Sequence, residues 1–452
     1  MDEDGEKHVR AKGSDEVDWI SKLPDCLLCE VLLNLPTKDV VKSSVLSTRW
    51  RNLWKHVPAL DLDNCDFHEF NTFLNFVDSF LDFNSESCLQ NFMLKYDCDD
   101  DDYEPEISII GRWINTIVTR NVKHIDVLDD SYGSWEVQLP SSIYTCESLV
   151  SLKLCALTLP SPKFVSLPSL KVMALLIAKF ADDLALETLI TKCPVLESLI
   201  VERCFCDEIE VLRVRSQSLL SFTHVADSDE GVVEDLVVEI DAPKLEYLRL
   251  SDYRVASFIL NKPGKLVEAD IDIVFNLSSG NKFNPADLPK RTMIRNFLVG
   301  ISTVKDMTIA SSTLEVIYDF SRCERLPLFR NLSVLCVEFY GYRWEMLPIF
   351  LESCPNLKTL VVKSTKYQEK QGDIVFSGPR RLLSSLEYVK IERPLKGEAM
   401  EMILVSYLLE NSTILKKLTL FLDDSVKKEE SVILKELLAI PRLSTPCKVV
   451  VL

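Results

Sequence analysis

The chain has 452 residues, 47% of them apolar, and a formal net charge of −18. An acidic chain is poorly suited to neutralising nucleic-acid phosphates or to lying on an anionic membrane, so neither is expected as a partner. No apolar run approaches the roughly 18 residues of a membrane-spanning helix.

Residues 1–16 are polar and charged, and we expect them to be disordered. They lack the apolar core of a secretory signal peptide. The chain is therefore expected in the cytoplasm or nucleus, where its 14 cysteines would remain reduced thiols.

Residues 17–60 form a compact block with three predicted short helices. The first begins near Pro24, the second follows Pro36, and the third begins near Ser47. The third carries apolar residues at helical spacing: Trp50, Leu53, Trp54 and Val57. The first is apolar on nearly all sides, and a block this small is unable to bury every apolar side chain. The surplus predicts an exposed patch that binds a partner, with packing of these helices onto the rest of the chain as the alternative.

An aromatic helix is predicted within residues 61–88, with a buried face formed by Phe70, Phe73, Val77, Phe80 and Leu81. An acidic run from Asp97 to Glu106 follows. We interpret this run as a solvated loop, because it lacks the glycine and terminal glutamate spacing of an EF-hand calcium site.

From residue 89 onward the sequence repeats an L-x-x-L-x-L frame, with conservative substitutions, mostly at intervals of about 21 to 29 residues, which is the period of leucine-rich repeats. Clear copies begin at Leu149, Leu196, Leu245, Leu332, Leu357, Leu386 and Leu415. Weaker copies begin at Leu89, Val122, Leu170, Leu266 and Val304, with a doubtful one at Leu219. Because side chains alternate along a strand, the fourth and sixth frame residues are expected in a shared core and the residue between them on a concave face.

Two of the frames follow a Cys-Pro pair, at Cys193 and Cys354. The proline is unable to continue the preceding helix, so it marks the turn into the strand. The cysteines are expected to fill small buried spaces.

The sequence contains no motif for catalysis or for cofactor binding: the G-x-S-x-G elbow, the phosphate-binding loop, the dinucleotide-binding turn and the H-E-x-x-H helix are all missing. A zinc site needs four ligands, and the Cys26-x-x-Cys29 pair has neither a second pair nor suitably spaced histidines. Cys204 and Cys206 straddle a predicted strand end, where their thiols should diverge. We therefore expect no catalytic residue, no cofactor and no metal, and a chain that is not an enzyme.

Residues 17–63 resemble an F-box in the form common in plants, carried by the segments LPD, LL, LPTKD and SVLSTRWRNLW. The resemblance implies docking on a Skp-type adaptor and, through it, on the cullin core of a ubiquitin ligase. It also implies the contact residues, some of which have the block's own small core as an alternative role: Leu23, Pro24, Leu27, Val31, Leu35, Pro36 and Trp50.

Residues 380–452 resemble the FBD domain that follows an F-box and leucine-rich repeats in many plant proteins. The match is carried by Gly397-Glu398, YLLEN at 407–411, Pro441-Arg442, Ser444 and Cys447. A stack of repeats needs a terminal unit, so we expect this segment to cap the solenoid. The chain is thus identified as a member of the plant F-box/LRR/FBD family with an α/β fold: a three-helix F-box (17–63), an irregular solenoid (64–379) with parallel strands on its concave face and helices and loops outside, and an α/β cap (380–452).

The resemblance implies the substrate-recognition subunit of an SCF-type E3 ubiquitin ligase, which holds an unknown protein target close to the conjugating enzyme. A binding scaffold without target turnover is the alternative. We expect target binding at variable concave positions, unless these are ordinary exposed strand residues: Tyr247, Arg249, Tyr253, Glu338, Tyr340, Lys358 and Lys363. A positive cluster in an otherwise acidic chain would favour an acidic or phosphorylated target segment.

Overall fold

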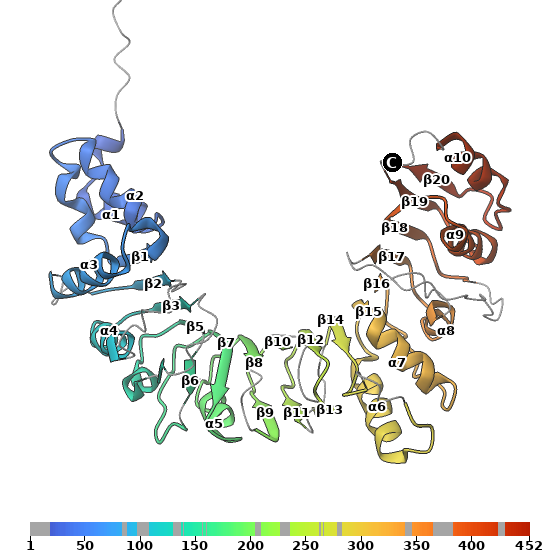
Figure 1. Ribbon diagram of the computed structural model, residues 1–452, viewed down its shortest axis with the longest axis horizontal. Coiled ribbons are helices and arrows are strands. Elements are labelled where there is room, and N and C mark those ends of the chain that lie inside the picture. The colour runs from blue at the N-terminus through green and yellow to red at the C-terminus, as the bar shows by residue number, and fades with distance from the viewer. Residues whose placement is uncertain are drawn as a thin grey trace, which may run out of the picture.

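The structure, a computed structural model, describes residues 19–83, 88–96, 108–129, 137–138, 140–155, 157–159, 161–203, 209–226, 236–261, 264, 266–277, 283–339, 346–364, 383–423 and 430–452. These residues form one long arc with the N-terminal helices at one tip and the C-terminus at the other (Figure 1). The predictions for residues 1–16, for the acidic run 97–106 and for Cys204, Cys206 and Tyr340 lie outside the described residues.

The N-terminal module contains η1 (Ile20–Lys22), α1 (Asp25–Leu32), α2 (Thr37–Lys42), η2 (Ser43–Val45) and η3 (Trp50–His56). Pro24 and Pro36 stand directly before α1 and α2, and their carbonyl oxygens accept the first helical hydrogen bonds. The third predicted helix is a 3-10 helix that begins at Trp50, not an α-helix that begins near Ser47. In this tighter helix residues three apart lie on one side, so Trp50 and Leu53 are both buried.

The module has its own small core, formed by Leu28, Leu32, Val40, Trp50, Leu53, Val57 and Ala59. The strand that follows, β1 (Ala59–Asp63), pairs in parallel with β2 (Asn91–Tyr96). The repeat frame therefore starts at Val57, earlier than the sequence prediction placed it, and Leu60 and Leu62 enter the core of the solenoid.

A continuous parallel sheet lines the inner side of the arc, and each of its strands pairs with the next one (Figure 1). After β1 and β2 its strands are β3 (His124–Asp129), β5 (Ser151–Cys155), β7 (Val172–Phe180), β8 (Ser198–Arg203), β10 (Ser221–Ala226), β12 (Tyr247–Asp252), β14 (Glu268–Ile273), β15 (Asp306–Ala310), β16 (Val334–Phe339), β17 (Thr359–Ser364), β18 (Tyr388–Leu395), β19 (Lys417–Leu422) and β20 (Lys448–Val451). Every predicted frame contains one of these strands, including the doubtful copy at Leu219, whose sixth residue is His224 instead of an apolar one.

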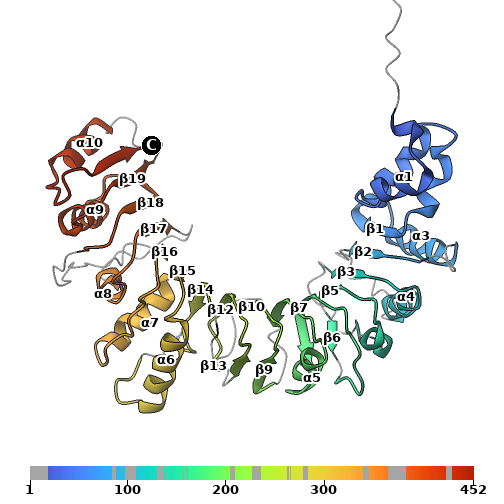
Figure 2. The same cartoon turned by 180° about the vertical axis from the view of Figure 1, so that it is seen from behind.

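The outer side of the arc carries the helices and short turns (Figures 1 and 2). They are η4 (Asn64–Asp66), α3 (Phe70–Phe83), α4 (Ser108–Val118), η5 (Ser141–Thr145), α5 (Ala185–Thr191), α6 (Leu288–Ile301), α7 (Ser311–Ser321), α8 (Leu347–Glu352), α9 (Ala399–Asn411) and α10 (Glu430–Ala439). The predicted aromatic helix is confirmed as α3, with Phe73, Val77, Phe80 and Leu81 buried.

The middle of the outer layer differs from the expected helices and loops. Here β9 (Val211–Arg215), β11 (Val237–Asp241) and β13 (Ser257–Asn261) form a second, three-stranded parallel sheet. Every second residue of β9 is buried, and the residues between are half-buried or exposed. This is the two-residue period of a strand. Two further strands, β4 (Val137–Gln138) and β6 (Leu157–Leu159), pair with each other, and β6 also pairs with the end of β7.

One continuous apolar core lies between the inner sheet and the outer layer. Both Cys-Pro cysteines are buried in it, as the sequence predicts. The Cys193 thiol donates to the Leu189 carbonyl oxygen at 3.2 Å, and the Cys354 thiol donates to the Phe350 carbonyl oxygen at 3.3 Å. Each thiol thus satisfies an acceptor in the last turn of the preceding helix.

The C-terminal segment extends the same inner sheet through β18, β19 and β20. Several residues that carry the FBD resemblance shape or bind the backbone of this segment. Gly397 adopts a left-handed conformation (φ 79°), and Glu398 with Glu401 forms a reciprocal capping box at the start of α9. The buried Ser444 hydroxyl donates to the Leu415 carbonyl oxygen at 2.8 Å.

Candidate protein-docking surfaces

The N-terminal module exposes seven large apolar side chains, which we call together the module patch: Trp19, Ile20, Leu27, Val31, Leu35, Val45 and Leu46. Leu27 and Val31 lie one turn apart on α1, while Leu28 and Leu32 on the same helix are buried. The helix is therefore apolar on both faces but covered on only one. Several large apolar side chains exposed within one small module favour a protein-binding site.

The predicted contact residues of the module separate into two groups. Pro24, Leu27, Val31, Leu35 and Pro36 are exposed. Leu23 is half-buried against the module core, and Trp50 is only 8% exposed within it. A buried indole offers little surface to a partner, which favours for Trp50 the core role that the sequence left open as an alternative.

Sequence reasoning missed Val45 and Leu46, which are 85% and 68% exposed, and also Trp19 and Ile20. These residues lie outside the predicted helices, so helical periodicity does not indicate them. The available signal was a pair of adjacent apolar residues inside the polar stretch Ser43-Ser44 to Ser47-Thr48.

Arg49 fixes the start of α1 against the segment before η3. Its guanidinium donates to the Asp25 carboxylate at 2.6 and 2.9 Å and also to the Leu23 carbonyl oxygen. These charge-assisted hydrogen bonds to Asp25 and Leu23 position α1, and with it the side chains of Leu27 and Val31.

The concave face is the second candidate surface. Tyr247 is half-buried and Arg249 is exposed on β12, and the Arg249 Nε lies 3.4 Å from the Asp270 carboxylate on β14. Burial and the negative charge of Asp270 raise the pKa of the Tyr247 hydroxyl, so the ring remains a neutral hydrogen-bonding group.

The remaining predicted target-binding residues are not all alike. The Tyr253 hydroxyl donates to the Asp272 carboxylate at 2.8 Å and its ring packs against the core, so it stabilises the solenoid. Glu338 and Lys363 are register partners on β16 and β17, with 3.6 Å between their charged atoms. Lys358 is exposed just before β17. The structure therefore separates the predicted residues into one group at β12 and another at β16 and β17.

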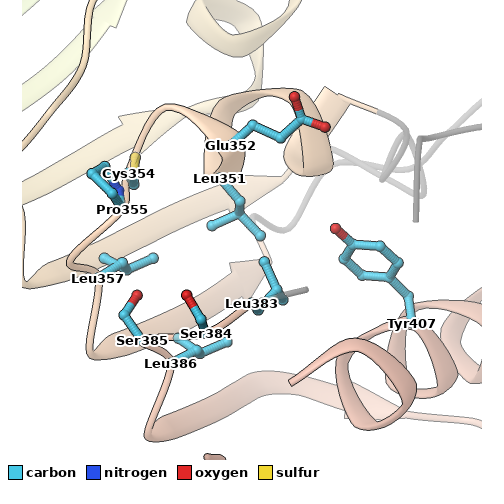
Figure 3. A pocket seen from close by; sticks show the side chains of 10 residues that line it. All are labelled: Leu351, Glu352, Cys354, Pro355, Leu357, Leu383, Ser384, Ser385, Leu386 and Tyr407. Atoms are coloured by element: carbon cyan, nitrogen blue, oxygen red, sulfur yellow. The ribbon is translucent and has the colours of Figure 1, made fainter. Parts of the chain in front are cut away.

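Among the cavities of the described part, one of about 200 Å³ lies where the repeats meet the C-terminal segment (Figure 3). Glu352, Tyr407 and the hydroxyls of Ser384 and Ser385 are its polar lining, and burial raises the pKa of Tyr407 to about 12. A serine nucleophile is usually activated by an adjacent histidine, and no histidine is among the described residues that line this cavity. Among the described residues, no cluster of three or more potential metal ligands occurs, and no helix is long and apolar enough to cross a membrane.

Comparison with known protein families matches three segments of the chain. Residues 20–60 match the F-box domain, and residues 377–420 match the FBD domain. Residues 110–262 match the leucine-rich repeats described for FBD-associated F-box protein At5g56370.

Whole-length relatives come from Arabidopsis thaliana. The chain is 88% identical to F-box/LRR-repeat protein 13 and 69% identical to F-box/FBD/LRR-repeat protein At1g78750, in each case over 100% of both chains. It is 41% identical to FBD-associated F-box protein At5g22730 over 96% of this chain and 94% of that one. The chain therefore belongs to the F-box/FBD/LRR-repeat family of plant proteins.

Proposed function

We propose that this protein is a substrate-recognition subunit of an SCF-type E3 ubiquitin ligase. F-box and leucine-rich-repeat proteins are generally non-enzymatic substrate adaptors of such complexes, and F-boxes generally bind Skp-type adaptors. In this proposal the F-box docks on the adaptor, the adaptor links it to a cullin core, and the solenoid presents a protein target for ubiquitination.

The observation that carries the proposal is the module patch. A soluble module gains nothing in stability from leaving Leu27, Val31, Val45 and Leu46 in water, whereas their burial by a partner would contribute about 25 cal/mol for each Å² covered. We propose Pro24, Leu27, Val31, Leu35 and Pro36 as adaptor contacts and add Val45 and Leu46, while Leu23 and Trp50 serve the module core.

The target would bind the concave face. The residues between the inward-pointing frame positions form in-register rows there, and neighbouring strands lie about 4.8 Å apart. Tyr247, Arg249, Glu338, Lys358 and Lys363 remain candidate contacts. The mechanism is proximity: holding a target lysine near the conjugating enzyme raises its effective concentration without catalysis by this chain.

The proposal implies a location in the cytoplasm or nucleus. The described cysteines are all free thiols, including the exposed Cys26, Cys65 and Cys88, and free thiols persist in a reducing compartment.

A charge in the module patch tests adaptor docking. Val31→Asp places a carboxylate at a position that is 56% exposed, so the module should stay folded while binding to a Skp-type adaptor falls. Truncating or charging an interface anchor costs about 2 kcal/mol or more, which corresponds to about a thirtyfold loss of affinity. Val299→Asp on α6, at a position that is 53% exposed, is the matched control and should bind normally. Equal adaptor binding by both variants and the unmodified protein would contradict the proposal.

Target turnover separates a ligase subunit from a scaffold. Proteins that accumulate when this chain is removed should decline again when the unmodified chain is restored, but not when Val31→Asp is restored. If Val31→Asp restores their turnover fully, turnover does not depend on the module patch and the proposal is contradicted, whereas the scaffold alternative holds if removal of the chain makes no protein accumulate.

A further inference from the structure

The charge on the concave face changes sign along the arc. The concave positions of β14 to β16 carry carboxylates: Glu268, Asp270, Asp272, Asp306 and Glu338. Nearer the C-terminus lysines outnumber carboxylates. Lys390, Lys417 and Lys448 lie on β18, β19 and β20, with Glu392 beside Lys390, and Lys416 directly precedes β19; we call these four lysines the C-terminal basic cluster. A chain with a net charge of −18 thus concentrates cations at one end of its inner surface.

Strand register brings the basic cluster together. Tyr388, Lys417 and Lys448 are successive register partners on β18, β19 and β20, so they form one row on the concave face. The Tyr388 side chain is 44% exposed. Lys390 lies two residues beyond Tyr388 on the same strand face, with its ammonium 5.5 Å from the centre of the Phe421 ring. The surface therefore offers cations beside an accessible aromatic ring.

The charges of this cluster are only partly neutralised by the protein itself. Lys416 pairs with Glu387 at 2.5 Å, and Lys390 pairs with Glu392 at 2.6 Å. Lys417 and Lys448 are exposed, and in the described part of the chain neither has an ion-pair partner. Two ammonium groups on adjacent strands thus remain available to a ligand of opposite charge.

From this arrangement we infer that the concave face of β18 to β20 binds a short acidic segment of the protein target, an inference that rests on the proposed function. Crossing the two strand steps from β18 to β20 takes about 10 Å, or about three residues of extended chain. Two carboxylates within such a segment would meet Lys417 and Lys448, and an apolar side chain at the end of the segment next to Lys417 would meet the Tyr388 ring. Complementary charge of this kind selects partners and speeds their encounter.

The neighbouring carboxylates favour a short acidic peptide over a nucleic acid or a membrane. A long polyanion leaving the basic cluster along the arc would reach Glu338, Asp306 and Asp270 within a few strands and be repelled. Burial, together with the negative charges of Glu338 and Asp272, raises the pKa of Asp270, which is consistent with carboxylates crowded at this place.

The test uses the full-length chain and a fluorescein-labelled peptide with four consecutive glutamates flanked by Gly-Ser, measured by fluorescence anisotropy. Lys417→Glu/Lys448→Glu should weaken binding at least about tenfold, and binding to the unmodified chain should weaken as salt rises. The matched control is Lys192→Glu/Lys244→Glu, which makes the same change in net charge at two exposed lysines outside the cluster and should leave affinity within about twofold.

Three results would overturn the inference: equal binding of a peptide with four glutamines, undiminished binding by Lys417→Glu/Lys448→Glu, or equally tight, cluster-dependent binding of a ten-nucleotide single-stranded DNA. The experiments distinguish failure of the adaptor-docking proposal from failure of the peptide-binding inference. Val31→Asp should keep peptide binding while losing the adaptor, and the lysine variant should keep the adaptor while losing the peptide.

Discussion

The His224 Nε2 atom lies 3.0 Å from a carboxylate oxygen of Asp252, and both side chains are fully buried between neighbouring repeats. The other Asp252 oxygen accepts from the Arg254 backbone N–H at 2.9 Å. An ionised carboxylate only accepts hydrogen bonds, so Nε2 carries the hydrogen in this contact. His224 occupies an inward-facing frame position that β8 and β12 fill with Val201 and Leu250, and its contact with Asp252 ties β10 to β12.

Removing the Asp252 carboxylate should destabilise the solenoid. Asp252→Ala leaves the buried His224 ring and the Arg254 backbone N–H without their acceptor, and each buried polar group left unsatisfied costs about 1–3 kcal/mol. Asp241→Ala, at a half-buried carboxylate on β11, is the control and should cost about 0.5 kcal/mol or less. Urea unfolding measures both, and equal midpoints for the two variants would show that the buried pair adds no stability.

The same pair predicts how stability depends on pH. Burial works to raise the pKa of the Asp252 carboxyl, but the hydrogen bond and charge of His224 and the contacts with Arg254 together lower it. A folded-state pKa below the unfolded value of about 3.9 stabilises the protein above that pH, and this stabilisation is lost as the pH falls through the folded pKa. The stability difference between the unmodified chain and Asp252→Ala should therefore shrink as the pH falls below about 4. A difference that instead grows on acidification would show that the folded-state pKa is raised.

Two glycines should respond oppositely to alanine. Gly397 has φ 79°, and an added Cβ would lie 2.8 Å from Ile433 Cγ1, so Gly397→Ala should cost about 1–3 kcal/mol. Gly111 lies inside α4 with nothing within 4 Å of an added Cβ, so Gly111→Ala should stabilise the protein by about 0.5–1 kcal/mol. Thermal melts of the two variants should shift in opposite directions, and a shared direction would contradict the backbone argument at one of the two positions.

The sequence predicts the inner sheet well because the frame that marks each strand lies within a few residues of chain. Apart from His224, the residues at positions four and six of the predicted frames are apolar. It predicts the outer layer less well, since the Val211–Arg215 strand is recognisable only beside β11 and β13. The Gly397-Glu398 pair is a recognisable family signature, but its role in a left-handed turn and a helix cap is visible only in the structure. Strand pairing depends on loop lengths, and so the alignment of Lys417 with Lys448 was not predicted.

Thiol reactivity should follow burial. Burial raises the pKa of Cys193 to about 12 and also raises that of Cys354, whereas Cys26, Cys65 and Cys88 are exposed. A raised pKa leaves less of the thiol as the reactive thiolate at a given pH. Iodoacetamide at pH 8 should therefore label the exposed cysteines first and the Cys-Pro cysteines only on unfolding, as read by peptide mass spectrometry. Rapid labelling of Cys193 in the folded protein would show that its turn opens locally.

The two roles within the F-box should separate by mutation. Trp50→Ala removes a buried indole from the module core and should cost about 3–5 kcal/mol, so adaptor binding is lost because the module unfolds. Leu27→Asp changes an exposed side chain, so the module should keep its melting temperature and lose adaptor binding alone. Tryptophan fluorescence reports the first effect and adaptor titration the second. If Trp50→Ala left the module folded but unable to bind, the indole would be a contact residue after all, because a core role predicts that folding and binding are lost together.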